Sequence, residues 1–152
     1  MLNYSMPRAG LLYLQRMLRE EHGFTVNLES PGPWPVKVTK GIVVGGAGIT
    51  IVSAPGKALD TASINFAIDQ AFQAPHYAVI LGGWLDTKTE RQWLDQVTIH
   101  EELDEALAIA RERSELAVYD LGSKVEHRIV YDENIASYPD DYDYHERFAT
   151  PL

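Results

Sequence analysis

The 152-residue chain contains no cysteine, so it forms neither a disulfide bond nor a thiolate metal site. No run approaches the roughly 20 apolar residues that a membrane-spanning helix needs. The first residues lack the basic start, apolar stretch and small-residue cleavage site of a secretory signal. These absences argue against a disulfide scaffold and an integral membrane protein, and we expect a cytoplasmic protein.

Basic residues are also scarce, because 13 Lys and Arg stand against 22 Asp and Glu, a formal net charge of −9 at pH 7. Nucleic-acid binding depends on Lys and Arg that neutralise phosphates, so we do not expect direct binding to DNA or RNA. An acidic surface is compatible with a protein partner that carries a basic surface. The simpler explanation is that negative charge keeps the protein soluble.

Catalytic and metal-binding motifs are missing as well. None of the five histidines pairs with another at the spacing of a zinc helix, and Asp104 stands where a metalloprotease motif beginning at His100 needs its second histidine. No G-x-S-x-G nucleophile elbow is present. The sequence therefore predicts a protein that is not an enzyme and that holds no metal and no cofactor.

Two features qualify that prediction. Four aspartates lie near predicted strand ends, where two carboxylates could meet and shift each other's pKa: Asp86, Asp95, Asp120 and Asp132. The glycine cluster at residues 45–48 has the composition of a phosphate-binding loop, but residues 49–52 continue as a strand and no Gly-Lys-Ser/Thr follows. We therefore expect a hairpin turn at these glycines.

What is present is a pattern of short strands and amphipathic helices. Residues 76–85 and 93–99 predict one antiparallel hairpin, and residues 116–119 and 125–131 predict a second. Between them, residues 101–114 predict a helix, with one apolar face formed by Leu103, Ala106, Leu107 and Ala110. This unit predicts a helix that packs on one face of an antiparallel sheet.

Two further helices are expected earlier in the chain. The first begins near Ser5 and Pro7, carries a leucine stripe, and ends at Gly23 as a left-handed cap. The second begins at Asp60 or Thr61, and its predicted buried face consists of Ile64, Ala67, Ile68, Ala71 and Phe72. The predicted fold class is α+β, an antiparallel sheet of hairpins with two to three amphipathic helices packed on it. Residues 1–133 are expected to form a single domain, followed by an acidic and aromatic tail at residues 134–152.

Two sets of residues are candidate binding sites. The first is the tail, where tyrosines interleave with aspartates and suit an interface with a basic protein surface: Tyr138, Asp140, Asp141, Tyr142, Asp143 and Tyr144. The tail is equally compatible with a solubilising role. The second is a pocket near Trp84, Trp93, Tyr119 and Asp120, which suits a small, nucleotide-type ligand that the protein sequesters or hydrolyses.

The core segments Gly82-Gly83-Trp84-Leu85-Asp86, Trp93-Leu94-Asp95 and Leu116-Ala117-Val118-Tyr119-Asp120-Leu121 resemble a set of small uncharacterised proteins of tailed phages and prophages. The resemblance covers roughly residues 76–131 and brings no known activity. It implies a phage origin and a site of action in the bacterial host cell. Our leading hypothesis is a phage accessory protein that binds a host protein, for example as an anti-CRISPR-like inhibitor of antiviral defence. The alternatives are the small-ligand protein and a virion or assembly component, with a homodimer as a further option.

Overall fold

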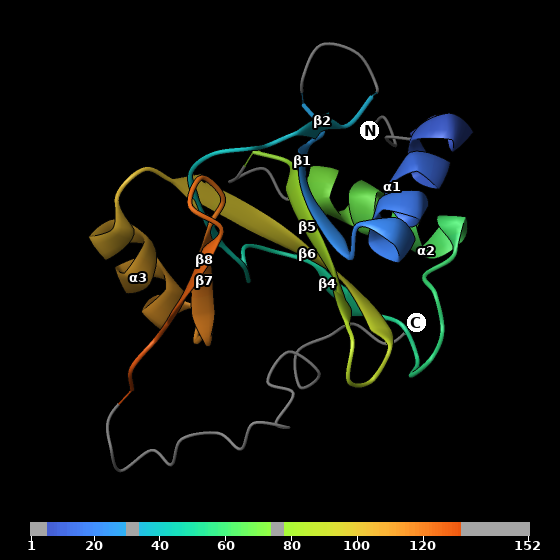
Figure 1. Cartoon of the computed structure of the whole chain (residues 1–152). Helices are drawn as coiled ribbons and strands as arrows, with labels where there is room; N and C mark the ends of the chain where they lie inside the picture. The colour runs from blue at the N-terminus through green and yellow to red at the C-terminus, as the bar shows by residue number, and fades with distance from the viewer. Residues whose placement is uncertain (1–5, 30–33, 74–77, 132–152) are drawn as a thin grey trace.

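The computed structural model describes residues 6–29, 34–73 and 78–131 (Figure 1). The elements of this part of the chain are α1 (Arg8–Glu20), β1 (Gly23–Asn27), β2 (Val36–Lys37), β3 (Ile42–Val44), β4 (Thr50–Val52), α2 (Thr61–Phe72), β5 (Ile80–Asp86), β6 (Arg91–His100), α3 (Leu103–Glu112), β7 (Ala117–Asp120) and β8 (Val125–Arg128). None of these helices is long and apolar enough to cross a membrane. The predicted tail lies outside the described residues.

The strands form one antiparallel sheet in the order β2-β1-β5-β6-β3-β7-β8, and β4 also pairs with β6. The ten-residue β6 is the centre of this sheet. One of its edges pairs with β5, whereas its other edge pairs first with β4 and then with β3. The predicted α+β class, with helices packed on an antiparallel sheet, is confirmed.

Both predicted hairpins are present, as β5–β6 and β7–β8. In the first hairpin the Asp86 carboxylate accepts from the Lys88 backbone N–H at 2.9 Å and from the Thr89 hydroxyl at 2.8 Å, which fixes the turn. The glycine pair in β5 causes no bulge, because the register with β6 is unbroken. A Cβ at Gly83 would lie 2.7 Å from the Phe24 ring, so the glycine is required by a close side-chain contact.

The expected hairpin turn at residues 45–48 is wrong. Strands β3 and β4 both run antiparallel to β6, so they point in the same direction and the chain does not reverse between them. Strands β3 and β4 are instead two parts of one interrupted strand, and the glycine segment between them loops out of the sheet; we call this loop the glycine excursion. It remains attached to β6 because the Ala47 N–H donates to the Gln96 carbonyl at 3.0 Å and the Gln96 N–H donates to the Ile49 carbonyl at 2.9 Å.

The helix ends follow local chemistry. Asp60 caps α2 by accepting from the Ser63 N–H at 2.7 Å. Of the two predicted cap residues, Asp60 and Thr61, Asp60 is therefore the one that is used. The predicted cap of α1 at Gly23 is wrong by one residue. His22 adopts the left-handed conformation, with φ of 62°, and Gly23 already belongs to β1.

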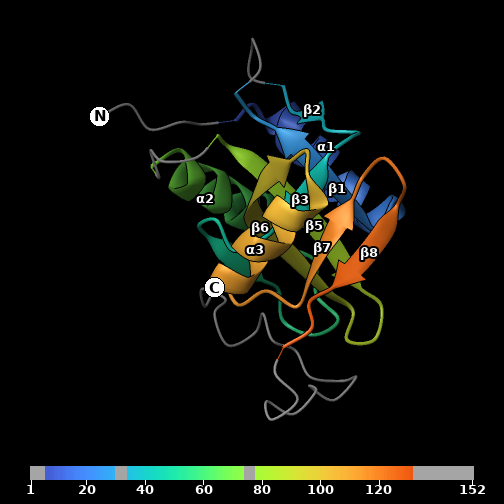
Figure 2. The ribbon, with the colours of Figure 1, turned by 90° about the vertical axis from the view of Figure 1, so that its left-hand side faces the viewer.

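All three helices cover one face of the sheet. Cross-strand register places Leu94, Thr98 and His100 on the same side of β6. Leu94 packs into the large apolar cluster beneath α1 and α2, whereas His100 lies 3.6 Å from Glu105 of α3. Figure 1 shows α3 outside β7 and β8 at one end and α1 and α2 outside β1 and β5 at the other, and Figure 2 faces α3 where it lies across the sheet. The sheet is therefore curved, with its convex face covered by helices.

Candidate functional site

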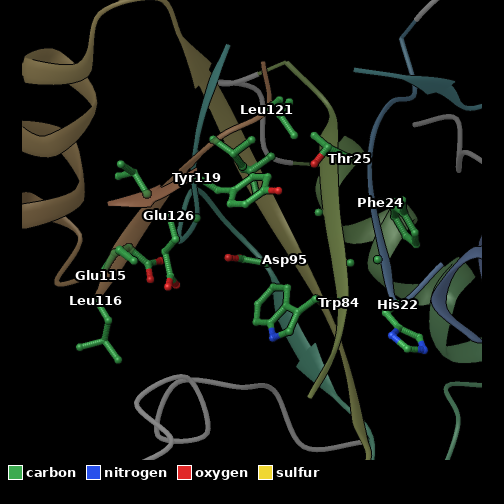
Figure 3. A pocket seen from close by; sticks show the side chains of 18 of the residues that line it. His22, Phe24, Thr25, Trp84, Asp95, Glu115, Leu116, Tyr119, Leu121 and Glu126 are labelled. Carbon is green, nitrogen blue, oxygen red and sulfur yellow. The ribbon is translucent and has the colours of Figure 1, made fainter. Parts of the chain in front are cut away.

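The concave face of the sheet holds a pocket of about 700 Å³ (Figure 3). Its lining comes from β1, β5 and β6 on one side and from β3, β7 and β8 on the other. The volume lies within the range of roughly 300–1,000 Å³ that is typical of small-molecule sites. The side chains that matter most for its chemistry are Trp84, Asp95, Glu115, Tyr119, Glu126 and Arg128.

An aromatic platform forms one wall. Trp84 of β5 and Trp93 of β6 are direct cross-strand partners, and their rings stack with parallel planes at a centroid distance of 5.6 Å. Trp93 is only 1% exposed, whereas Trp84 is half-buried and lines the pocket. Tyr119, which is 40% exposed, lies on the β7 wall. The Trp93 ring therefore supports the Trp84 ring at the pocket surface.

Two buried carboxylates meet at the base of the pocket. Asp95 is 2% exposed and Glu115 is 5% exposed. An oxygen of each lies within 3.0 Å of the point that a Cβ of Gly45 would occupy, so the two carboxyl groups are close neighbours and only glycine fits at position 45. Figure 3 shows them pointing toward one another, with the Trp84 ring beside Asp95.

The Asp95 carboxylate is held by two donors. The Thr50 hydroxyl donates to it at 2.7 Å, and the Gly46 N–H donates to both oxygens, at 3.1 and 3.3 Å. The glycine excursion between β3 and β4 therefore supplies a backbone donor to a buried acid. This use of its N–H differs from that of a phosphate-binding loop, whose amides point at the ligand.

Glu115 is placed by the end of α3. Ser114 adopts φ of 59°, its N–H donates to the Arg111 carbonyl at 3.1 Å, and the Glu115 N–H donates to the Ala110 carbonyl at 2.9 Å. This pair of bonds is a Schellman motif, which ends a helix and redirects the chain. The Tyr131 hydroxyl also donates to the Glu115 backbone carbonyl. The acid is thus fixed on ordered backbone immediately before β7.

Burial makes both acids weak. Desolvation raises the pKa of Asp95 to about 6, against the hydrogen bonds from Thr50 and Gly46 and the attraction of Arg113. Desolvation, followed by repulsion from Asp95, raises the pKa of Glu115 to about 8. Near pH 7 the pair therefore holds one proton, which resides mainly on Glu115.

Arg113 lies behind this pair and stabilises the strand ends. Its guanidinium donates to the Val44 carbonyl at 3.3 Å, the Gly45 carbonyl at 3.2 Å and the Thr98 hydroxyl at 2.8 Å. These bonds connect β3, the glycine excursion and β6 at the point where β4 gives way to β3. Arg113 is a structural cation close to the site, and it does not line the pocket.

The predicted pocket residues have different positions. Trp84 and Tyr119 line the pocket, and Trp93 supports Trp84 from behind. Asp120 holds the β7–β8 turn instead, because its carboxylate accepts from the N–H groups of Gly122 and Ser123 at 3.0 and 3.3 Å. The tail residues of the other predicted site, Tyr138, Asp140, Asp141, Tyr142, Asp143 and Tyr144, lie outside the described residues.

Of the four strand-end aspartates, only Asp95 lines the pocket among those described. Asp86 holds the β5–β6 turn, Asp120 holds the β7–β8 turn, and Asp132 is not among the described residues. Glu115 belongs to none of the motifs or candidate sites that the sequence indicates. The sequence does contain a pattern that points to Asp95. It lies two residues from both Trp93 and Val97 in one predicted strand, so the three side chains face the same side of the sheet.

Within residues 6–29, 34–73 and 78–131, no three His, Asp or Glu side chains come together in a way that could hold a metal ion. No protein-family model, curated protein or solved structure significantly matches this chain. The pocket geometry alone therefore supports the functional argument.

Proposed function

We propose that this protein binds a small organic molecule in the pocket on the concave face of the sheet. The observation that carries the proposal is the pairing, in one pocket of about 700 Å³, of a supported tryptophan ring and two buried carboxyl groups. An apolar surface that fixes a flat ligand, together with a few convergent polar groups that orient it, is the usual construction of a small-molecule site.

The free-energy cost of burying Asp95 and Glu115 supports a functional role for the two acids. Asp95 and Glu115 lose hydration on folding, and the raised pKa of each measures that cost. Carboxyl groups whose pKa values are strongly raised by burial, when they line a pocket, are concentrated at functional sites. The helices cover the other face of the sheet, so the fold does not need these two acids for its apolar core.

Simple sequestration is favoured over hydrolysis. Paired acids with separated pKa values are also the machinery of acid–base catalysis, which makes hydrolysis the second candidate. However, the Asp95 oxygens already accept from Thr50 and Gly46, and the residue is almost fully buried. A base that must take a proton from water needs a more open position than this.

A sequestering protein fits the phage resemblance of residues 76–131, because removing a small molecule from the host cell is one way for a phage protein to act. Host-protein binding through the tail remains the separate hypothesis from the sequence. It depends on residues outside the described part of the chain. The pocket and the tail are therefore independent proposals.

A thermal-shift screen of the full-length protein tests the proposal. The panel contains nucleosides, nucleotides and flat heteroaromatic compounds of positive, zero and negative charge, applied to the wild type, Trp84→Leu and Trp34→Leu. We expect at least one compound to raise the Tm of the wild type and of Trp34→Leu but not that of Trp84→Leu. Trp34 is the matched control, because it is 47% exposed and contacts Tyr13 at a ring distance of 5.2 Å, away from the pocket. Absence of any shift, or equal shifts in all three proteins, would contradict the proposal.

A further inference from the structure

We propose that the ligand is a flat organic cation, which stacks on Trp84 and places its positive charge against the Asp95–Glu115 pair. This inference rests on the proposed binding function and specifies the class of ligand. It follows from the charges around the pocket, from the hydrogen bonds already made there and from the chemistry of the tryptophan ring.

The charged side chains around the pocket are mostly acidic. Four carboxyl groups line it, against one arginine and one histidine: Glu21, Asp95, Glu115 and Glu126, with His22 and Arg128. Position strengthens this bias, because Asp95 and Glu115 are buried whereas Arg128 and His22 are exposed. Charges in a low-dielectric environment act far more strongly than charges screened by water. The interior of the pocket therefore favours a cation.

The donors that an anion would need are already used. The Gly46 N–H donates to Asp95 and the Ala47 N–H donates to the Gln96 carbonyl, so these amides of the glycine excursion point at the protein and not into the pocket. Arg113, the cation nearest to the two acids, donates to two backbone carbonyls and to Thr98. A phosphate or carboxylate beside the two acids would therefore gain no compensation from these groups, and the cations that do line the pocket, Arg128 and His22, are exposed to water.

The aromatic wall has the same preference. A tryptophan face carries partial negative charge and attracts a cation within about 6 Å of its centre, more strongly when the site is shielded from water. The Trp93 ring stacks on one face of the Trp84 ring at a centroid distance of 5.6 Å, and this contact holds the Trp84 ring in a fixed orientation. A flat cation can thus contact an aromatic face and a carboxylate at once, which a neutral or anionic ring cannot do equally well.

Binding of a cation should displace the proton that the pair holds. Near pH 7 Glu115 carries that proton because its pKa is about 8. The groups that act on the pair are Arg113 from the end of α3 and Thr50 and Gly46 on the β4 side. Two further charged side chains of the same pocket, Glu126 and Arg128, come from β8. A bound positive charge would add to the effect of Arg113 and favour ionised Glu115. The cation and the proton therefore compete for the same pair.

Isothermal titration of the full-length protein with three probes of one ring system tests the inference. N-methylquinolinium carries a fixed positive charge, quinoline is neutral near pH 7, and quinoline-4-carboxylate is negative. We expect N-methylquinolinium to bind at least tenfold more tightly than either of the others. Its affinity should rise roughly tenfold between pH 7 and pH 9, as the proton on a group of pKa about 8 ceases to compete. Titrations at pH 7 in two buffers of different ionisation enthalpy should show close to one proton released for each cation bound.

Two variants show whether the buried pair, and not the general acidity of the pocket, is responsible. Glu115→Gln keeps the shape and removes the ionisable group, so we expect at least a tenfold loss of N-methylquinolinium affinity at pH 9 and unchanged quinoline binding. At pH 7, where the wild type releases close to one proton, the variant should release none. Glu126→Gln removes an exposed carboxylate of the same pocket, so its effect should be less than threefold, because water screens that charge.

The outcomes separate this inference from the function on which it rests. If quinoline or its carboxylate binds as tightly as the cation, or if Glu126→Gln costs as much as Glu115→Gln, the cation assignment is wrong while the pocket remains a binding site. The assignment is also overturned if the cation binds with no proton released at pH 7. If a nucleotide shifts the Tm in a Trp84-dependent way and N-methylquinolinium does not bind, the binding function stands and the ligand class is wrong. If no compound of either set binds, both proposals fail.

Discussion

The two faces of the sheet differ in what they bury. The convex face packs aliphatic side chains beneath α1, α2 and α3 in two apolar clusters, whose fully covered members include Leu94, Ile51 and Ile68 in the larger and Val44 and Ala106 in the smaller. The concave face carries tryptophan, tyrosine and carboxylates around an open pocket. Strand β6 contributes to both, because Leu94 faces the helices whereas Trp93 and Asp95 lie on the opposite side, where Asp95 lines the pocket.

This difference shows how a small domain can hold a destabilising site. Burial of apolar area contributes about 25 cal/mol per Å² to folding, and here that contribution comes mainly from the helix-covered face. The concave face contains two acids whose ionisation is opposed by burial. Substitutions on the convex face should therefore change stability, and substitutions on the concave face should change binding and pH dependence.

The largest expected effect is on the convex face. Leu94→Ala removes a fully buried side chain from the large cluster, so the free energy of unfolding should fall by about 2–5 kcal/mol. The matched control is Val125→Ala, which should change it by less than about 0.5 kcal/mol because Val125 is 45% exposed. Urea unfolding followed by circular dichroism measures both. Equal effects in the two variants would contradict the assignment of stability to the helix-covered face.

The next effect is the pH dependence that the concave face imposes. A carboxyl group whose pKa is higher in the folded than in the unfolded state adds stability at low pH, and that stability is lost as the pH rises through the folded pKa. For Glu115 the window runs from the ordinary glutamate pKa of 4.5 to the folded-state pKa of about 8. Glu115→Gln should flatten the stability profile across this window, and the variant should exceed the wild type most at pH 9. Parallel profiles from pH 5 to pH 9 would show that Glu115 is not held in a desolvated environment.

A smaller effect on stability is expected from a buried polar side chain on the convex face. Gln96 is fully buried on the same side of β6 as Leu94, and neither Nε2 nor Oε1 of its amide has a hydrogen-bond partner among the described residues. Because an unsatisfied buried polar group costs about 1–3 kcal/mol, Gln96→Met should raise the free energy of unfolding by about 1–2 kcal/mol. The exposed Gln73→Met provides the comparison, with no gain expected. A loss of stability in Gln96→Met would mean that this amide is satisfied in solution.

The smallest effect on stability is expected at the end of α3, where Ser114 connects the helix to Glu115 of the pocket. Ser114 ends α3 in a left-handed conformation, with φ of 59°, which glycine adopts without strain. Ser114→Gly should therefore raise the free energy of unfolding by about 0.5–1 kcal/mol, whereas Ser114→Ala should not raise it. Thermal unfolding of the two variants side by side is the measurement. Stabilisation by alanine equal to that by glycine would remove the left-handed cap as the cause.

Periodicity predicted the fold well because it reports which face of an element is buried. The apolar stripe of residues 103–110 predicted α3, and the alternation around Trp93 predicted β6. The glycine cluster at residues 45–48 predicts a hairpin turn that does not form, and the reason is physical. Sequence shows that glycines interrupt a strand, but whether the chain then reverses or continues depends on which strand it pairs with, and that partner, β6, lies some 50 residues farther along the chain.

The site was harder to predict than the fold for the same reason. Trp84 and Tyr119 could be identified as pocket candidates from their residue types, but Asp95 and Glu115 meet only because the sheet curves and α3 ends in a Schellman motif. Their raised pKa values arise from burial, which no local pattern encodes. Asp120 is the opposite case, because the sequence predicts it in the pocket whereas its carboxylate holds the β7–β8 turn.

The position of the binding site can be tested directly by NMR, by following the indole N–H signals of the three tryptophans during a titration of the full-length protein with N-methylquinolinium. Substitution of each tryptophan by phenylalanine assigns the signals. We expect the Trp84 signal to move most and the signal of its stacking partner Trp93 to move less, while the signal of Trp34 beside Tyr13 stays in place. A titration that moves Trp34 as far as Trp84 would contradict the assignment of the concave pocket as the binding site. A titration that moves none of the three signals would contradict the assignment of a flat cation as the ligand.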